Sequence, residues 1–596
     1  MSLTIITKPV VTRHFLTYDF EWIPGEPIHE GITKPLQIRV CGCYDGESYR
    51  SYSTVRAFLQ SELTHKNRGA WFFGHAGGLA DLGFILAEIK SLMCEQGFRV
   101  KASFSGSSAI IVHVTRGKHT WHFIDSYWLL RDKLENIAKW IGLEKGAAEK
   151  RRTREESIAF YGGAPIAELT TYNEQDCVIL WKAIDEFENA LLDFGGQLQM
   201  TLASSAMHLF RRHFLSRNIE TSDYANDIGR QAYFASRVEV FCQDATDCNY
   251  YDINSSFPYA MTFPAPGEVL GTKRTLPNSE DAIFLADCLI EVRDCFLPPI
   301  PHRAHGRVFF PVGRWRTWLS SIDVRLLERT GGRIEKVYEC IGFAPFHDLA
   351  DYAKTLYTKR KNATTDMEKV VYKLLLNSLY GKFAESPDKQ AVLFNPPEMP
   401  KEATMYCPGV WLQDVQVPIP HAHVPVSTHI TAIARQSIFD WLAVCEPDFY
   451  YCDTDGFATT ANLDTGKELG ELKLEKVLTD ARFQAPKVYR FTTAEGKEVV
   501  KAKGFSDMSR EKFDRLIDGE FVEFQRMARI KELYGRLHSP DPVEVLIKKC
   551  LKGISLTKRF TYPDGTTRPW SIDELYSGKL FVPFDEGLSE PDWLDL

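Results

Sequence analysis

The sequence predicts a multidomain α+β protein, and three observations support this prediction. The chain has 596 residues, more than one hydrophobic core usually holds, so it should divide into several domains. Up to about residue 190, strand-like apolar runs alternate with longer runs that have helical spacing, as in a domain of mixed strands and helices. Two proline-rich stretches, residues 297–302 and 394–402, indicate the boundaries of inserted elements farther along the chain.

The expected elements follow from these patterns. β-branched and aromatic runs predict strands, and apolar residues three and four positions apart predict helices. Residues 201–217 predict a helix that leads to a second unit starting near Tyr233, and the charged last ninety or so residues predict helices followed by turns around residues 562–570. In the first domain, the predicted strands are residues 14–22, 69–78, 109–115 and 120–128, and the predicted helices are residues 130–143 and 172–194.

Composition limits the class of protein. The hydrophobic fraction of 44% and the charged fraction of 25% are ordinary for a soluble globular protein. Because the net charge is −8, any nucleic-acid site must be a local basic channel on an acidic body. The 13 cysteines are scattered without paired CxxC motifs, which disfavours a structural zinc site and indicates reduced thiols. No segment approaches the roughly 18 apolar residues of a membrane span, so we expect a cytoplasmic protein without membrane contact.

The decapeptide FYYCDTDGFA, residues 449–458, predicts a β-hairpin whose polar tip is followed by Gly456. Asp453 and Asp455 are two residues apart, so in a strand they would point to the same side. Two adjacent carboxylates repel each other, and a divalent cation removes this cost. Oxygen ligands select Mg²⁺ or Mn²⁺. The alternative is a solvated turn without a metal.

A second acidic strand and a polar helix face accompany this hairpin. Residues 249–261 begin with a predicted strand that carries Asp252. The segment KLLLNSLYGKF, residues 373–383, places a cation, an amide, an aromatic ring and a gap on one helical face, which would suit a triphosphate and its base. The alternative is an amphipathic helix with a leucine core face, and both descriptions can hold. The four residues, at offsets of 0, 4, 7 and 8, are Lys373, Asn377, Tyr380 and Gly381.

The N-terminal part carries a second set of carboxylates. Asp19 and Glu21 lie two residues apart in a predicted strand, so they share a face. Asp81 comes from a separate segment, and Tyr172 and Asp176 are four residues apart on a predicted helix. Four acids from three segments can converge on two metal ions, which would activate a water molecule against a phosphodiester.

Taken together, these segments resemble the sequence motifs of family B DNA polymerases. Three motifs in the same order are similar to the palm and fingers motifs of that family, and a fourth resembles the motif that contacts the primer terminus. The resemblance implies an RNase H-like 3′-5′ exonuclease domain, followed by a right-hand polymerase with palm, fingers and thumb. The motifs are Asp252-x-x-Ser255-x-Phe257-Pro258, Lys373-x-x-x-Asn377-Ser378-x-Tyr380-Gly381, Tyr451-x-Asp453-Thr454-Asp455 and Lys487-x-Tyr489.

For the polymerase centre, the resemblance implies two Mg²⁺ ions, with Mn²⁺ as a possible substitute, held by Asp252 and Asp455 and assisted by Asp453. Family members commonly have a tyrosine where Phe257 stands, and a phenyl ring would still block a ribose 2′-hydroxyl. Lys373 would act on the incoming triphosphate as a catalytic residue. The implied nucleotide-binding residues are Ser255, Phe257, Lys369, Asn377 and Tyr380, and the implied primer-binding residues are Lys487 and Tyr489.

For the exonuclease centre, the resemblance implies that Tyr172 orients the attacking water. The family usually has an asparagine after the histidine of the second exonuclease motif, whereas Ala76 follows His75 here. An exonuclease domain that is inactive and kept for DNA binding is the alternative, and Lys145 could equally be a solvated loop lysine. The implied metal ligands are Asp19, Glu21, Asp81 and Asp176, and the implied contacts with single-stranded DNA and the scissile phosphate are Ser126, Tyr127 and Lys145.

Between the two domains, Tyr233 belongs to a segment that resembles a template-binding Tyr-x-Gly-Gly/Ala linker. Ala235 and Ser236 replace the small glycines of that linker. An ordinary strand with Tyr233 in its core is the alternative. The expected domains are residues 1–195 (exonuclease), 196–240 (linker), 241–505 (palm and fingers, with insertions at about 262–350 and 384–424) and 506–596 (thumb and C-terminal region).

The two insertions lie where protein-primed polymerases of bacteriophages and linear plasmids have theirs, and the chain is most similar to that group. The resemblance implies a monomeric, strand-displacing DNA polymerase that replicates a viral or linear plasmid genome. Its partners would be DNA template and primer, deoxynucleoside triphosphates, and a terminal protein whose hydroxyl primes synthesis. A DNA-primed family B polymerase and a noncatalytic nucleic-acid-binding relative are the alternatives.

Two expectations concern the surface that would hold DNA. The insertion at 384–424 should be a stiff β-hairpin or arm that closes around the duplex, or alternatively a surface insertion without mechanical role. A basic cluster in the last fifty residues should grip phosphates as part of the thumb, with a solvated charged face as the alternative. This cluster consists of Lys548, Lys549, Lys552, Lys558 and Arg559.

Overall fold

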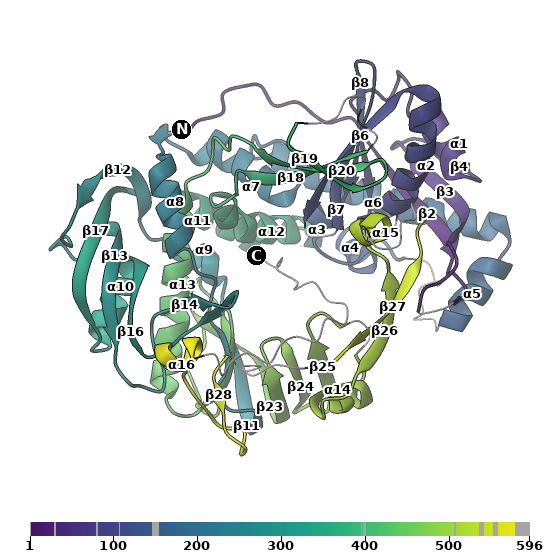
Figure 1. Cartoon of the computed structure of the whole chain (residues 1–596). Helices are drawn as coiled ribbons and strands as arrows, with labels where there is room; N and C mark the ends of the chain where they lie inside the picture. Colours follow the sequence, from purple (N-terminus) through teal and green to yellow (C-terminus); the bar gives the residue numbers. More distant parts are fainter. Residues whose placement is uncertain are drawn as a thin grey trace.

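The computed structural model describes residues 2–28, 31–78, 81–105, 108–145, 154–394, 396, 401–505, 508–535, 541–551 and 558–577. In Figure 1 the elements follow one another around the view: the N-terminal domain lies at the upper right, a sheet-rich insertion at the left, and a central sheet at the bottom. The yellow C-terminal strands run between the central sheet and the N-terminal domain. No helix among the described residues is both long enough and apolar enough to cross a bilayer.

The N-terminal domain is built on a mixed sheet. Strands β2, β5 and β8 pair in parallel, and the other strands of this domain pair antiparallel. The expected strand at 120–128 ends earlier, at Asp125, because its Oδ1 accepts the backbone N–H of Tyr127 and turns the chain into a short helix. The strands are β2 (Phe15–Ile23), β3 (Gln37–Tyr44), β4 (Tyr49–Tyr52), β5 (Trp71–Gly74), β6 (Phe98–Ser105), β7 (Ser108–Arg116) and β8 (His119–Asp125). The helices are α1 (Val55–Glu62), α2 (Asp81–Gln96), α3 (Tyr127–Leu130), α4 (Leu134–Trp140), α5 (Arg154–Gly163) and α6 (Ile166–Leu192).

The segment expected as a linker, residues 196–240, holds several regular elements. They are α7 (Leu202–Leu209), a π-helical turn (Phe210–Phe214), β9 (Ile219–Glu220, paired with β1, Ser2–Leu3), α8 (Asp223–Ala232) and β10 (Val238–Val240). Two long helices, α11 (Asp348–Lys361) and α12 (Asp366–Lys382), pack against this region. Helix α12 begins at a capping box, in which the side chains of Thr365 and Glu368 satisfy each other's backbone N–H groups.

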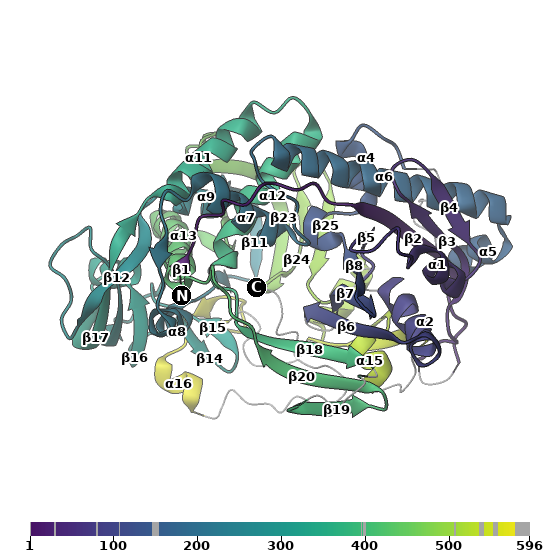
Figure 2. The same ribbon diagram turned by 90° about the horizontal axis from the view of Figure 1, so that it is seen from above.

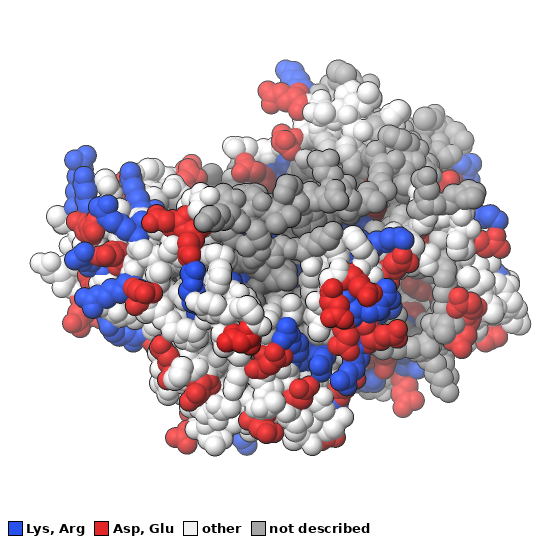
Figure 3. All heavy atoms as spheres, turned by 60° about the horizontal axis from the view of Figure 1, so that its bottom comes forward, with Lys and Arg blue, Asp and Glu red and all other residues white. Residues whose placement is uncertain are grey.

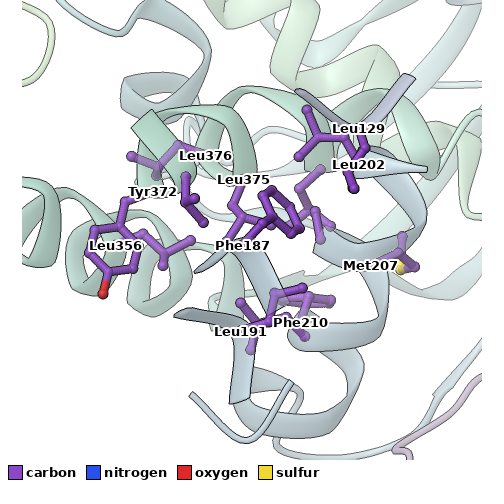
Figure 4. Close-up of a cluster of buried hydrophobic side chains, with 14 of the residues drawn as sticks. Leu129, Phe187, Leu191, Leu202, Met207, Phe210, Leu356, Tyr372, Leu375 and Leu376 are labelled. Carbon is purple, nitrogen blue, oxygen red and sulfur yellow. The ribbon is translucent and has the colours of Figure 1, made fainter. Parts of the chain in front are cut away.

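A shared helical core fixes the position of α12 relative to the N-terminal domain. Phe187 and Leu191 of α6, Phe210 of the π-helical turn and Leu375 of α12 lie in one buried cluster (Figure 4). Each such side chain contributes roughly 1.5–3 kcal/mol when it is fully buried. Leu376 and Leu379 of α12 are buried in the same cluster, so the amphipathic description of this helix holds.

The central sheet has the strand order β10-β21-β22-β11-β23-β24-β25. The predicted hairpin at 449–458 is confirmed, since β21 and β22 pair antiparallel, and β11 lies between β22 and β23. The elements of this part are β11 (Asp244–Ile253), α9 (Ser256–Ala260), β21 (Phe449–Asp453), β22 (Gly456–Thr459), β23 (Leu472–Ala485), β24 (Val488–Thr493) and β25 (Glu498–Ala502).

The first insertion forms a separate antiparallel sheet with the order β12-β17-β13-β16, drawn at the left of Figure 1. Helix α10 covers it, and α13 (Val424–Cys445) packs against both the insertion and the central part. The elements are β12 (Ala265–Lys273), β13 (Ile283–Val292), β14 (His302–Ala304), β15 (Arg307–Phe309), β16 (Gly313–Ser320), α10 (Ser321–Arg329) and β17 (Arg333–Phe346).

The second insertion is a β-hairpin, as expected, but the hairpin is not a separate arm. Strands β18 (Asp388–Phe394) and β20 (Val410–Gln416) pair antiparallel, and β19 (Ala403–Cys407) adds to β20. Residues 391–394 of β18 also pair with β6, so the hairpin extends the N-terminal sheet to ten strands, as Figure 2 shows. The structure thus fixes the hairpin to the N-terminal domain, because the edge strand β6 offers unpaired backbone groups. Of the prolines in this insertion, Pro397 and Pro400 lie outside the described residues.

Glu385 holds the root of the second insertion together. Its carboxylate accepts hydrogen bonds from Lys389 on β18 and from His421 beyond β20, at 2.9 Å each, and it pairs with Lys382 of α12. Burial alone would raise the pKa of this carboxyl, but the hydrogen bonds from His421 and the two lysines hold it well below its usual value. Because the pKa is lower in the folded state, the charged carboxylate stabilises the fold at pH values above the unfolded-state pKa of about 4.3. This stabilisation is lost progressively as the pH falls from there through the folded-state pKa.

We therefore expect Glu385→Gln to loosen the insertion at pH 7 by about 1.5–3 kcal/mol, because hydrogen bonds to a charged acceptor are replaced by neutral ones. Hydrogen exchange of the amides in β18 and β20 should become faster by about tenfold or more. As the pH falls below about 4, the difference from wild type should shrink progressively, since the carboxyl becomes protonated in the opened state whereas the folded site keeps its charge to lower pH. Glu402→Gln, at the exposed tip of the same insertion, is the matched control, and equal protection in all three proteins would contradict this role.

The C-terminal part is not mainly helical over its described residues, contrary to the expectation from its sequence. Its helices are short, and an antiparallel ribbon of β26 and β27 packs on the N-terminal domain, where Leu546 N–H donates to the carbonyl of Gly31. Its apolar residues, such as Phe524 and Val545, join the core of that domain. The elements are α14 (Arg510–Ile517), β26 (Val522–Met527), α15 (Ile530–Gly535), β27 (Glu544–Lys549), β28 (Phe560–Thr561), β29 (Thr567–Arg568) and α16 (Ile572–Tyr576).

The expected basic cluster is not a single patch. Arg559 is 1% exposed, and its guanidinium donates to Thr567 and to the carbonyl of Phe296, so it cannot contact phosphates. Lys548 forms an exposed ion pair with Glu523. On the face shown in Figure 3, lysine and arginine side chains lie beside acidic ones. Lys552 lies outside the described residues.

Candidate active sites

The central sheet brings two of the predicted carboxylates together. Asp252 stands near the end of β11, opposite Gly456 of β22. The backbone N–H of Ile253 donates to the carbonyl of Asp455, in the turn between β21 and β22, at 2.8 Å. The two acids are therefore neighbours in space although they lie 203 positions apart in the chain. Gly456 is required here, because a Cβ at this position would come within 2.8 Å of the Tyr250 hydroxyl oxygen.

Both carboxyl groups are electrostatically unfavourable without a cation. Burial and then the charges of Asp252 and Asp453 raise the pKa of Asp455 to about 7. Burial and then Glu475 raise the pKa of Asp252 to about 6, against the opposing effect of Lys473 and Lys373. Clustered, half-desolvated carboxylate oxygens fit a hard divalent cation such as Mg²⁺ or Mn²⁺.

Asp453 has partners of its own. Its Oδ2 accepts the Tyr451 hydroxyl at 3.3 Å, and its Oδ1 lies 3.8 Å from the Lys487 Nζ. Tyr489 is 9% exposed and packs against Tyr451 and Phe483. Lys487 is therefore partly exposed beside the β21–β22 hairpin, whereas the buried Tyr489 ring packs against Tyr451 of β21.

Helix α12 presents its predicted polar face. Lys369, Lys373 and Asn377 are exposed, and a Cβ added at Gly381 would meet open space. The Tyr380 ring stacks on the Phe257 ring of α9, with centroids 4.2 Å apart and planes 9° apart. The stack joins α9, which follows Asp252, to α12, which carries Lys373.

Ser255 stands at the turn between β11 and α9 with a φ of 50°. A serine in this left-handed region is strained by about 1–2 kcal/mol. Arg360 of α11 donates to the Ser255 hydroxyl at 3.3 Å. A second cation, besides Lys373, thus lies beside the predicted nucleotide-binding turn.

The linker that carries Tyr233 docks on this site. Tyr233 lies between α8 and β10 rather than in a strand, so the alternative of a strand-core tyrosine is wrong. Ser236 donates its hydroxyl hydrogen to the carbonyl of Thr454 at 3.1 Å. This hydrogen bond connects the linker to the turn between β21 and β22. Buried Arg435 donates to the carbonyl of Phe234 and pairs with Asp323 of the first insertion.

The N-terminal carboxylates also converge. Oxygen atoms of Asp19, Glu21 and Asp176 all lie within 4.8 Å of one another. The alternation of β2 puts Asp19 and Glu21 on one face, and α6 packs across β2 and β3 with Asp176 toward them. Burial raises the pKa of Asp19 to about 6 and that of Glu21 well above its usual value, so these oxygens fit a divalent cation.

Lys145 belongs to this site. Its side chain is 7% exposed, and its Nζ lies 3.1 Å from the Asp176 Oδ2 and 5.5 Å from the centre of the Tyr172 ring. The alternative of a solvated loop lysine is therefore wrong. Its charge opposes the burial that raises the pKa of Asp19.

The remaining predicted residues surround the group of three. Asp81 is not part of the 4.8 Å group but is buried beside it, and its Oδ1 has no hydrogen-bond partner among the described residues. Ser126 Oγ lies 3.0 Å from His75 Nδ1, and Tyr127 is 42% exposed. Ala76, where the family has asparagine, has a φ of 54°. Asparagine adopts this conformation more readily than alanine, so the exchange removes an amide and adds strain.

The comparisons with known proteins agree with this geometry. Residues 163–421 match the family described as DNA polymerase type B, organellar and viral. The DNA-directed DNA polymerase of Enterobacteria phage PRD1 is 25% identical over 545 residues, which cover 85% of this chain and 88% of that protein. Over these residues the chain resembles the type B DNA polymerase family.

The chain is also similar to a fungal protein in sequence and to a phage polymerase in fold. A probable DNA polymerase of Neurospora intermedia is 26% identical over 395 residues, or 59% of this chain. The chain spans less than half the length of the first curated relatives it matches. The fold is similar to that of Phi29 DNA polymerase complexed with primer-template DNA, with a TM-score of 0.70, 19% identity, and coverage of 90% of this chain and 99% of that one. The predicted multidomain α+β fold is confirmed.

The sequence did not predict several residues that support the two groups of carboxylates. Arg435 had a signal, since it interrupts the apolar run of α13, as a buried charge with a partner would. The others lie in polar segments where no local pattern distinguishes them from solvated residues. They are Arg360 beside Ser255, Glu475 beside Asp252, and Asn173 between the N-terminal carboxylates.

Proposed function

We propose that this chain is a DNA-directed DNA polymerase that carries a 3′-5′ proofreading exonuclease and starts synthesis from a terminal protein. The observation that carries the polymerase proposal is the convergence of Asp252 at the end of β11 with Asp455 in the turn between β21 and β22, with Lys373 acting electrostatically on Asp252. The match of residues 163–421 to the type B DNA polymerase family and the likeness to the phage PRD1 polymerase support the same activity.

In the polymerase centre, the chain would position a primer 3′-hydroxyl against the α-phosphate of a deoxynucleoside triphosphate. Two Mg²⁺ ions held by Asp252 and Asp455 would supply charge stabilisation of the attacking and leaving oxygens. Lys373 and Lys369, exposed on α12, would neutralise the triphosphate, and Arg360 would add a third cation. Phosphoryl transfer depends mainly on such positioning and neutralisation.

The stacked rings of Phe257 and Tyr380 would form the floor of the nucleotide site. A ribose 2′-hydroxyl would meet the Phe257 ring, so we expect Phe257→Val to raise ribonucleotide incorporation relative to deoxynucleotide incorporation by at least about tenfold. Single-nucleotide insertion with paired dNTP and rNTP substrates measures this ratio. Phe263→Val, which changes a partly exposed ring outside the stack, is the control. An unchanged ratio in Phe257→Val would exclude the ring as the steric barrier.

Primer extension tests the polymerase proposal. A labelled primer on a template with a downstream duplex, incubated with Mg²⁺ and four dNTPs, should be extended through the duplex without a helicase. Absence of any extension would overturn the polymerase proposal, and arrest at the duplex would overturn strand displacement alone.

In the exonuclease centre, Asp19, Glu21 and Asp176 would hold divalent ions that activate water against a 3′-terminal phosphodiester. Tyr172 and Lys145 lie together at the edge of this group, where a hydroxyl can orient the water and a cation can meet the phosphate. Asp81, buried beside Asp19 with a free oxygen, would complete the ligands. Tyr127 would stack on the single strand, with Ser126 beneath it.

The likeness to the polymerases of phages PRD1 and phi29 supports the proposal of protein priming. The terminal-protein proposal predicts a covalent protein–nucleotide adduct when the chain is incubated with a terminal protein and a labelled dNTP. Extension of DNA primers without any adduct would favour a DNA-primed polymerase. DNA binding without extension would favour a noncatalytic relative.

A further inference from the structure

A buried amide sits between the carboxylates of the exonuclease centre. Asn173 of α6 is fully buried, and its Nδ2 lies 3.0 Å from the Asp19 Oδ2 and 3.4 Å from the Glu21 Oε1. The same nitrogen donates to the backbone carbonyl of Asp19 at 3.0 Å. One NH₂ group thus connects two side chains whose charges repel each other.

The orientation of this amide is determined by its surroundings. Ionised carboxylates accept hydrogen bonds and do not donate them, so the NH₂ end must face Asp19 and Glu21. The other end, Oδ1, accepts the hydroxyl hydrogen of Tyr49 on β4 at 2.9 Å. Tyr49 therefore fixes the amide from the side opposite to the acids.

The neighbouring strand is shaped to leave room for this arrangement. A Cβ on Gly42 of β3 would come within 1.7 Å of the Asn173 Oδ1 and within 2.8 Å of the Tyr49 ring. Figure 2 shows α6 lying beside β2 and β3, against which it packs. Any larger residue at position 42 would displace the amide from the carboxylates.

We propose that Asn173 is a positioning residue that sets the Asp19 and Glu21 side chains for divalent-ion binding, with Tyr49 and Gly42 as its support. This inference rests on the proposed exonuclease function. Asn173 holds the two acids at ligand spacing through the partial positive charge of its NH₂ group. Groups that orient metal ligands in this way typically change metal affinity by about 10- to 100-fold when removed.

The test measures Mn²⁺ binding by calorimetry in a background that carries Asp252→Asn and Asp455→Asn, so that the exonuclease centre provides the remaining carboxylate site of the pair. Asn173→Ala should raise the Kd for Mn²⁺ about 10- to 100-fold. Gly42→Ala should have a similar effect, and Tyr49→Phe a smaller one in the same direction. Asn189→Ala, which removes an exposed amide of the same helix, should leave the Kd unchanged.

Activity supplies a second readout in the otherwise wild-type chain. Degradation of single-stranded DNA by Asn173→Ala should fall at low Mn²⁺ and recover as Mn²⁺ is raised, while primer extension stays at the wild-type rate. A purely structural defect would not recover with metal. A Kd within twofold of a Mn²⁺-binding parent would overturn this inference alone. A parent that neither binds Mn²⁺ nor degrades single strands would overturn the exonuclease proposal as well.

Discussion

Asp455→Asn should reduce primer extension by at least about 1,000-fold, the scale expected when a preorganised charge at the reacting phosphate is lost. The substitution keeps the size of the side chain but removes the charge that would hold a divalent ion opposite Asp252. The backbone contact between Asp455 and Ile253 involves no side-chain atom, so the hairpin should fold normally. Single-turnover incorporation of one nucleotide under saturating Mg²⁺ measures the effect.

Two controls make the Asp455 result specific. Asp464→Asn changes an exposed acid in the loop after β22 and should extend primers at the wild-type rate. Degradation of single-stranded DNA should be unchanged in Asp455→Asn, because Asp19 and Glu21 stand on β2 of the N-terminal sheet and Asp176 stands on α6, apart from the central sheet. Equal extension by Asp455→Asn and wild type would end the catalytic assignment.

Asp19→Ala should abolish 3′ degradation of single-stranded DNA, with a loss of about 1,000-fold or more, and should leave primer extension intact. Asp19 contributes an oxygen to the group that lies within 4.8 Å, so its removal opens the metal site. Digestion of a labelled oligonucleotide and primer extension are measured on the same preparation.

The control for Asp19 is an acid of the same domain outside the site. Glu47→Ala, in the exposed turn between β3 and β4, should degrade single strands normally. Equal loss of degradation and extension in Asp19→Ala would indicate a folding defect. Retained degradation would mean that the three carboxylates do not form the exonuclease centre.

The sequence alone determined the residues that carry local geometric information. Asp19 and Glu21 share a strand face, and Lys373 and Tyr380 share a helix face, because side-chain direction repeats with the period of the backbone. The hairpin around Asp453 follows from the same kind of pattern. These relations extend over a few residues, so they are visible without a structure.

Tertiary structure decided what depends on contacts between distant segments. Arg559 belongs to a charged stretch of sequence yet is buried beneath Phe296, and the hairpin at 388–416 extends the N-terminal sheet because β6 offers an unpaired edge. Asn173 gained its place only when α6 packed across β2 and Gly42 left room for the amide. Packing between elements more than a hundred residues apart carries no periodic signal along the chain, and for this reason only the folded molecule showed which polar residues support its two groups of carboxylates.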